Sequence, residues 1–199
     1  MSPDTVADFV AIAALILAYL AGSVSAAIIV CRVMGLPDPR TDGSRNPGTT
    51  NVLRLGGKKA AAFTLLGDML KGLLPVIAAR HYGLDVMLVS AVGFAAFLGH
   101  LYPIFFRFEG GKGVATALGV LLALSPIIGG VVIALWLSAF ALTRISSIGA
   151  IVGFIAAPIL THFLLSEAML GVVGISLLLL ARHKPNIKAL IEGKERRFK

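Results

Sequence analysis

Two short polar segments combine a basic residue with several glycines, and each lies between hydrophobic stretches. Residues 107–116 read Arg-Phe-Glu-Gly-Gly-Lys-Gly-Val-Ala-Thr, and residues 42–51 read Asp-Gly-Ser-Arg-Asn-Pro-Gly-Thr-Thr-Asn. Glycines allow backbone N–H groups to approach an anion, and a neighbouring cation adds favourable charge. This chemistry suits phosphate. The two segments therefore predict a protein that handles phosphorylated substrates.

The segment at 42–51 belongs to a longer polar stretch, roughly 32–58, which we expect to be a cytoplasmic loop. A loop of this length in a compact chain is usually either functional or disordered. Three prolines stiffen it, and its hydroxyl, amide and guanidinium groups indicate a polar pocket. The alternative is an anchor for lipid headgroups. The candidate pocket residues are Ser44, Asn46, Thr50, Asn51 and Arg54.

The segment at 107–116 surrounds Lys112 with glycines, at Gly110, Gly111 and Gly113. It does not fit the P-loop pattern GxxxxGK[ST], because Phe106 takes the place of the first glycine and Gly113 that of the hydroxyl residue. Nucleotide hydrolysis thereby loses its main support. The glycine N–H groups and Lys112 remain candidates for a phosphate site. The alternative is a lysine that only sets membrane topology.

A third polar cluster begins where the last hydrophobic stretch ends, with Arg-His-Lys-Pro-Asn-Ile at residues 182–187. At the C-terminal end of a helix, the dipole favours a protonated His183. This ring could donate a hydrogen bond to phosphate or act as a base. The alternative is one more basic residue at the membrane interface.

Two opposite charges, Asp68 and Lys71, fall inside the second hydrophobic stretch, three positions apart. That spacing places them on one helix face. Charges within a membrane span are costly and usually paired. We therefore expect a structural ion pair rather than a catalytic one.

The composition indicates an integral membrane protein. Hydrophobic residues make up 57% of the 199 residues, and the mean hydropathy is +0.91. We predict an all-α, multi-pass protein forming a single membrane-embedded domain over 1–199, with seven transmembrane helices. The fourth and fifth are separated only by the turn signal Ser125-Pro126. The predicted helices cover 9–31, 60–79, 86–99, 114–124, 126–142, 148–165 and 168–181.

The charge distribution predicts the orientation. With the N-terminus outside, all lysines and arginines except Lys71 and Arg80 fall on the cytoplasmic side, as does the C-terminus. This asymmetry follows the positive-inside rule. It accounts for the net charge of +8 without nucleic-acid binding, since the basic residues are not interleaved with base-stacking aromatics.

Several other classes of site are excluded. Cys31 is the only cysteine, so intrachain disulfides and Cys-x-x-Cys sites cannot form. No histidine or carboxylate cluster indicates a metal site, and no cofactor is implied. The motif H-x-x-x-x-D of acyltransferases that use acyl-CoA is absent.

The three polar segments together resemble the bacterial acyl-phosphate:glycerol-3-phosphate acyltransferase family, the PlsY type. The resemblance extends over nearly the whole chain. Its residues are Gly22-Ser23, Asp38-Pro39-Arg40, Gly43-Ser44 to Asn51, Arg54, Gly56, Gly99-His100, Pro103, Phe105, Gly110 to Thr116, His183, Asn186-Ile187, Leu190, Gly193 and Glu195.

The resemblance implies an enzyme of the bacterial cytoplasmic (inner) membrane whose active site faces the cytoplasm. It would transfer an acyl group from a fatty acyl phosphate to the 1-hydroxyl of glycerol 3-phosphate. The products would be lysophosphatidate and inorganic phosphate, for phospholipid synthesis. Membrane lipid and the enzyme that makes acyl phosphate are the other partners it suggests. A transporter for a phosphorylated anion and a non-enzymatic lipid-binding scaffold are the rival hypotheses.

The resemblance also implies roles for single residues. Ser44, Arg54 and Lys112 would bind the phosphate of glycerol 3-phosphate, and His183 and Asn186 the head of the acyl phosphate. Glu195 would be structural.

Two residues depart from the family pattern Gly-Ser-Gly-Asn-Pro-Gly-Ala-Thr-Asn. Arg45 replaces its second glycine, and Thr49 replaces its alanine. Arginine enters positive φ less readily than glycine. We expect an effect on binding strength rather than on the reaction.

Overall fold

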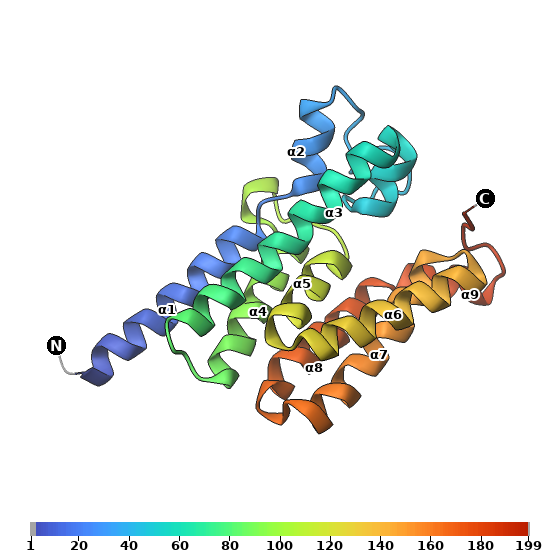
Figure 1. Cartoon of the computed structure of the whole chain (residues 1–199). Coiled ribbons are helices and arrows are strands. Elements are labelled where there is room, and N and C mark those ends of the chain that lie inside the picture. Colours follow the sequence, from blue (N-terminus) through green and yellow to red (C-terminus); the bar gives the residue numbers. More distant parts are fainter. Residues whose placement is uncertain (1–2, 199) are drawn as a thin grey trace.

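The computed structural model describes residues 3–198, and every regular element in that range is a helix (Figure 1). Residues 1, 2 and 199 lie outside this description. They belong to the predicted domain, and Lys199 is one of the predicted cytoplasmic charges. The α-helices are α1 (Pro3–Gly22), α2 (Ala26–Val33), α3 (Thr49–His81), α4 (Val86–Leu101), α5 (Val114–Leu124), α6 (Pro126–Thr143), α7 (Ser146–Leu164), α8 (Met169–Arg182) and α9 (Lys184–Ile191). Two short 3-10 helices lie in the connections between α-helices: η1 (Ile104–Phe106) between α4 and α5, and η2 (Ser166–Ala168) between α7 and α8.

Each predicted hydrophobic stretch is helical, with two differences in where helices begin and break. The first stretch is divided after Gly22, and Ser25 caps α2 by accepting a hydrogen bond from the Ile28 amide at 3.4 Å. The expected loop at 32–58 is shorter than predicted, because α3 begins at Thr49. Thr50, Asn51 and Arg54 therefore project from helical turns, although Gly57 interrupts that helix with a φ of 74°.

Among residues 3–198, five helical segments have the length and hydropathy to cross a membrane, or six if the pair α8 and α9, bent by 52°, counts as one. The fourth predicted span is the exception. α5 has 11 residues, about 16 Å of helix, against a hydrocarbon core of about 30 Å. It packs against α3, α4 and α6, and most of its side chains are buried. Protein rather than lipid therefore surrounds this short apolar helix.

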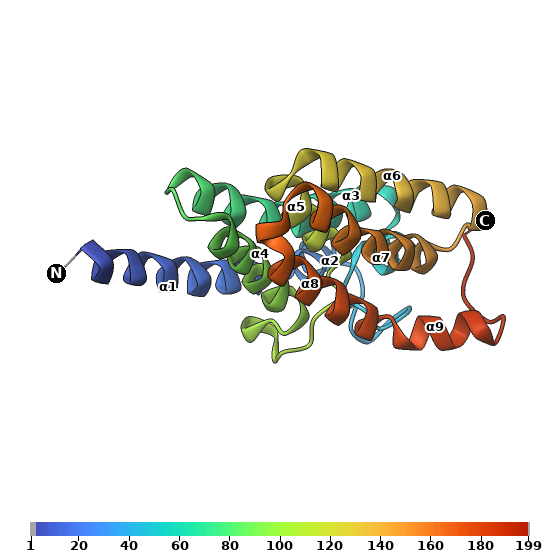
Figure 2. The same ribbon diagram turned by 90° about the horizontal axis from the view of Figure 1, so that it is seen from below.

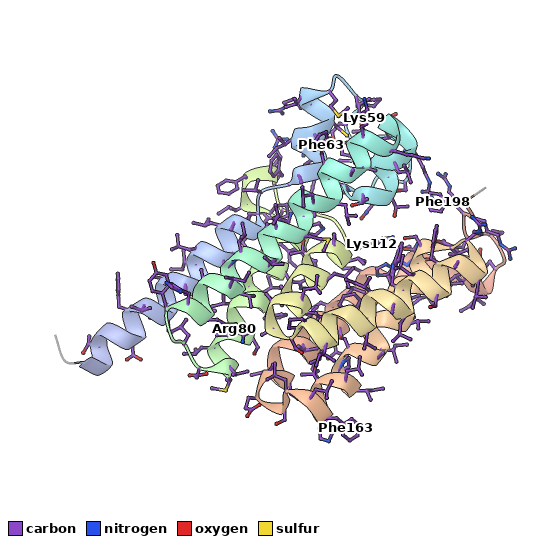
Figure 3. All side chains as sticks on the ribbon, in the orientation of Figure 1. Lys59, Phe63, Arg80, Lys112, Phe163 and Phe198 are labelled. Carbon is purple, nitrogen blue, oxygen red and sulfur yellow. The ribbon has the colours of Figure 1, made fainter. Side chains whose placement is uncertain are left out.

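Close helix contacts depend on glycine. α3 and α5 approach at Gly72 and Gly119, where an added Cβ would collide with the backbone oxygens of Thr116 and Met69 respectively. Small residues at such crossings let membrane helices pack through their backbones. Larger apolar side chains such as Phe63 and Phe163 instead project outward from the bundle (Figure 3), as expected of surfaces that face lipid.

The arrangement of the helices gathers the polar segments. Figure 1 places α2, the loop after it and the first turns of α3 at the same end of the bundle as α9 and the C-terminus. The N-terminus lies at the opposite end, also in the view from below (Figure 2). The short connection between α5 and α6 follows the prediction, since Ser125 ends one helix and caps the next.

Candidate active site

The three polar segments meet in one cavity of about 590 Å³. Ser44 reaches it from the first loop, Lys112 from the second and His183 from the junction of α8 and α9. The other predicted site residues that line it are Asn46, Thr50, Asn51, Arg54, Asp68, Gly113, Asn186 and Glu195. The chain thus brings together residues that are as far apart in sequence as Ser44 and Glu195.

The first loop is fixed by the buried amide of Asn51. Its Oδ1 accepts from the Ser44 backbone N–H at 2.8 Å, and its Nδ2 donates to the oxygens of Pro39 and Asp42 at 3.0 Å each. The amide was predicted to bind substrate. Its hydrogen bonds instead go to the loop backbone, which places Ser44 at the cavity wall.

The same loop carries an ion pair and a strained residue. Arg40 donates to both carboxylate oxygens of Asp38, with Nη2 at 2.7 Å from Oδ2, and this hydrogen bonding lowers the pKa of Asp38. Arg45 has a φ of 55°, the left-handed region that we expected its position to require. It does not line the 590 Å³ cavity.

Lys112 is held in a chain of polar side chains. Its Nζ donates to Asn186 Oδ1, Asn186 Nδ2 donates to Glu195 Oε1 at 2.6 Å, and Ser147 Oγ donates to the same oxygen at 2.9 Å. Burial lowers the pKa of Lys112, and the nearby Arg182 and Arg54 lower it further, while Glu195 opposes them. A bound phosphate would supply the negative charge that this environment lacks.

Two of the three glycines beside Lys112, Gly110 and Gly111, do not line the 590 Å³ cavity. Gly110 and Gly111 present their carbonyl oxygens to the Arg182 guanidinium, at 2.9 and 3.0 Å from Nη2. The Gly111 N–H donates to the His100 oxygen at 3.2 Å. Only Gly113, with a φ of 83°, lines the cavity, at the start of α5.

His183 is buried at the end of α8. Its Nδ1 lies 2.8 Å from the Leu179 carbonyl oxygen, which can only accept, so Nδ1 carries a proton and Nε2 is the ring atom left for a ligand. The helix dipole favours a protonated ring at this position, and burial opposes it by lowering the pKa of His183. The residue can donate from Nε2 only when the ring is protonated, and can accept when it is neutral.

The predicted pair between Asp68 and Lys71 is present, with Oδ1 and Nζ 2.9 Å apart. Lys71 Nζ also donates to the Val24 oxygen at 2.8 Å and does not line the cavity. His100, which the sequence did not single out as a site residue, lies 3.6 Å from the same Asp68 oxygen and 3.1 Å from Thr116 Oγ1. This buried polar cluster links α3, α4 and α5.

The cavity has an apolar part between α3, α5 and α6. Trp136 and Phe140 stack with ring centroids 5.2 Å apart, and Phe140 meets Phe198 edge-on at 5.5 Å. The Arg54 guanidinium lies 5.2 Å from the centre of the Phe198 ring. In Figure 3, Phe198 lies beside the C-terminal end of the chain, and Lys112 lies nearer the middle of the molecule, between α3 and α6. Further apolar lining comes from Leu53, Leu65, Met69, Val114, Ala115, Leu118, Ile133, Leu137 and Ala150.

Comparison with known proteins decides the family. The family model described as glycerol-3-phosphate acyltransferase matches residues 12–193. The chain belongs to this family. Curated glycerol-3-phosphate acyltransferases from Methylococcus capsulatus and Methylobacillus flagellatus are 53% and 54% identical to it, over 91% and 92% of this chain and 92% and 94% of theirs.

A solved structure of a glycerol 3-phosphate acyltransferase has the same fold as this chain. The crystal structure of PlsY, an integral membrane glycerol 3-phosphate acyltransferase, in its glycerol 3-phosphate form superposes with a TM-score of 0.90. It is 38% identical, and the match covers 95% of this chain and 96% of that one. A second PlsY structure, in the lysophosphatidic acid form, gives 0.88. The chain is therefore an all-helical, integral membrane member of this bacterial acyltransferase family.

Several cavity residues were not identified from the sequence. Thr49, Ser146, Ser147, Arg196 and Phe198 all line it. The basic tail contained a signal for Arg196, but a charged tail at a membrane surface usually needs no further explanation. Arg182 and His100 were missed as supports of the glycine loop, because nothing in their local sequence shows which carbonyl groups they approach. Within residues 3–198, no three His, Cys, Asp or Glu side chains group so as to hold a metal ion.

Proposed function

We propose that this protein transfers the acyl group of a fatty acyl phosphate to the 1-hydroxyl of glycerol 3-phosphate, releasing lysophosphatidate and inorganic phosphate for phospholipid synthesis. The observation that carries this proposal is the two-part cavity. One part is polar and cationic, and the other is apolar and lined by membrane-embedded helices. Such a cavity suits an acceptor from water and a donor with a long hydrocarbon chain.

Ser44, Arg54 and Lys112 bind the phosphate of the acceptor. Arg54 and Lys112 line the same cavity and supply two cations. Asn51 places Ser44 at the wall of that cavity. Guanidinium and ammonium groups bind phosphate through charge-assisted hydrogen bonds. The glycerol 3-phosphate form of PlsY, which shares this fold, supports the choice of acceptor. Asn46 and Thr50 complete the polar wall.

Asn186 holds the phosphate of the donor through its amide N–H, and His183 does so through Nε2 when its ring is protonated. Asn186 Oδ1 accepts from Lys112 Nζ, so a donor phosphate that accepts from the second N–H of Asn186 Nδ2 lies near the ammonium group. Glu195 orients Asn186 and is structural. The acyl chain occupies the apolar part, between Met69 on α3 and Leu137 on α6.

The chemistry requires little beyond alignment and charge stabilisation. An acyl phosphate is a mixed anhydride, so the acceptor oxygen forms a bond to the acyl carbon while the bond from that carbon to the phosphate oxygen breaks. The departing phosphate takes the proton of the hydroxyl group and leaves as inorganic phosphate. Lys112 and its cationic neighbours stabilise the negative charge. His183 as general base is the competing mechanism.

The membrane arrangement follows from the same reasoning. We propose seven membrane-embedded helical segments, with α1 and α2 forming the first and α5 a short internal one. The N-terminus lies outside, and the cavity and C-terminus face the cytoplasm of a bacterial inner membrane. The single domain spans the whole chain, and the enzyme that makes acyl phosphate is a candidate partner.

Turnover by the purified protein tests the function. Palmitoyl phosphate and glycerol 3-phosphate are supplied together in detergent, and phosphate release and lysophosphatidate are measured. We expect both products in equal amounts, and none with palmitoyl-CoA as donor. Binding of both compounds without turnover would support a scaffold, and glycerol 3-phosphate uptake into vesicles without acylation a transporter.

Two substitutions at His183 separate the mechanisms. With the donor phosphate as base, His183→Gln retains substantial turnover because the amide still bonds to phosphate, whereas His183→Ala loses it. Equal loss of kcat in both variants would favour His183 as the base. The measurement is kcat at saturating concentrations of both substrates.

A further inference from the structure

A second cavity, of about 760 Å³, lies at the same end of the molecule and is separate from the substrate cavity. Its walls come from α2, the loop after it and the segment around η1. Four arginines line it: Arg32, Arg40, Arg45 and Arg107. Glu109 is the only carboxylate among its lining residues. None of these side chains has a part in the proposed acyl transfer.

The charges in this cavity are not balanced. Arg40 pairs with Asp38 at 2.7 Å and with Glu109 at 3.4 Å. Within residues 3–198, no ion pair is formed by Arg32, Arg45 or Arg107. Three guanidinium groups therefore line one cavity without a carboxylate at ion-pair distance, although Arg32 lies near enough to Asp38 to help lower the pKa of that carboxyl group. Like charges gathered in this way repel each other, and a bound anion relieves the repulsion.

The backbone is strained where two of these arginines lie. Arg45 and Arg107 each have a φ of 55°, a left-handed conformation that costs a side-chain-bearing residue free energy. At Arg45 the family pattern has glycine, which would adopt this φ without that cost. Arg45 thus occupies a backbone conformation that favours glycine over a residue with a side chain.

The cavity is bordered by apolar side chains that project into the surroundings. Ile104, Phe105 and Phe108 are 47%, 58% and 57% exposed, and Phe105 also lines the cavity. Exposed aromatics beside arginines are typical of the membrane–water interface, where rings insert among acyl chains and cations meet headgroup phosphates. Neither the binding of a soluble anion nor that of an acidic protein segment requires such an apolar border.

We propose that this arginine groove, formed by Arg32, Arg45 and Arg107, binds the headgroup phosphate of an anionic membrane phospholipid. The acyl chains of the lipid lie against Phe105 and Phe108. The groove shares Gly110 with the loop that carries Lys112, and shares Pro47 with the loop that carries Ser44. A lipid seated here braces both substrate-binding loops from their outer side.

Native mass spectrometry of the delipidated protein tests this, with phosphatidylglycerol or phosphatidylcholine added at equal concentrations. The groove is altered in R45Q/R107Q, and K58Q/K59Q removes the same charge from exposed positions of α3 outside the groove. We expect the wild type to prefer phosphatidylglycerol. R45Q/R107Q should bind it at least about tenfold more weakly, and K58Q/K59Q within about twofold of the wild type. No substrate is present, so the result does not depend on the proposed reaction.

R32Q provides a second test on α2, away from the strained backbone, and should also weaken phosphatidylglycerol binding. Equal binding of the two lipids, or equal loss in the groove and control variants, would overturn the proposal. Displacement of phosphatidylglycerol by inorganic phosphate at constant ionic strength would instead assign the groove to a soluble phosphate. An acidic peptide that displaces the lipid where inorganic phosphate fails would assign it to a protein partner.

Discussion

The loop at residues 34–48 and the loop at 107–113 have similar compositions but contribute to the cavity in different ways. The first presents side chains, with Ser44 and Asn46 at the wall. The second presents Lys112 and Gly113, while Gly110 and Gly111 turn their carbonyl groups to Arg182. Glycines near a cation predict a phosphate site in both loops, but in the second loop Gly110 and Gly111 bind protein through their carbonyl groups.

The two loops are also held by different means. A side-chain amide from α3, that of Asn51, organises the first loop through three hydrogen bonds. The second is clamped by a guanidinium from α8 and lies against His100 of α4. Holding the two loops at the cavity therefore depends on α3, α4 and α8, which come from three parts of the chain.

The largest effect is expected from Lys112→Ala, which removes the one side chain that the second loop supplies to the cavity. We expect kcat/KM to fall by about 10²–10³-fold, because a charge-stabilising donor is lost from a buried site. The KM for glycerol 3-phosphate should rise more than that for acyl phosphate. Initial rates with each substrate varied in turn measure this, and equal changes in the two KM values would contradict the assigned site.

The next effect is expected from Asn51→Ala, which releases the first loop. It removes the hydrogen-bond partner of the Ser44 N–H and of the Pro39 carbonyl group, and one of the two donors to the Asp42 carbonyl group. A group left unsatisfied away from water costs roughly 1–3 kcal/mol. We expect lower thermal stability and at least tenfold lower activity, because Ser44 is no longer fixed. Thr41→Ala, an exposed change on the same loop, is the control. If the two variants unfold at the same temperature, Asn51 does not organise the loop.

Gly111→Ala tests the packing role of glycine in the second loop. The added Cβ would lie 2.7 Å from the Pro47 oxygen and collide with His100 Nε2. Overpacking of this kind costs about 1–3 kcal/mol. Gly130→Ala is the matched control, since nothing lies within 4 Å of its added Cβ in α6. Thermal unfolding in detergent compares them, and a Gly111→Ala protein as stable as the control would refute this explanation.

The smallest effect is expected from Arg45→Gly in the first loop. Relief of the left-handed strain stabilises the folded state by about 1 kcal/mol or less, because glycine also gains entropy in the unfolded chain. Gly35→Ala is the opposite control, with a φ of 65° and nothing within 4 Å of the new Cβ, and it should destabilise the protein. Unfolding in a neutral detergent measures both. A clear loss of stability in Arg45→Gly would show that the arginine side chain stabilises the loop more than its strain costs.

The sequence by itself determined the family, the helical membrane architecture and most of the cavity. Long apolar runs can only be satisfied in lipid as helices, and a phosphate site needs cations and donors whose types are visible in the chain. For these reasons Ser44, Arg54, Lys112 and His183 could be named before their positions were known. The i,i+3 spacing of Asp68 and Lys71 was sufficient to predict their pair, because helix geometry is local.

Tertiary structure alone decided which groups meet. Asn51 binds backbone that lies up to 12 residues before it, and Arg182 binds carbonyl groups more than 70 residues before it. Neither contact has a local signal. The short α5 is stable because α3, α4 and α6 enclose it, which its length and hydropathy do not reveal. Local residue type sets the available chemistry, and helix packing sets which polar atoms are already satisfied and which remain free to bind a ligand.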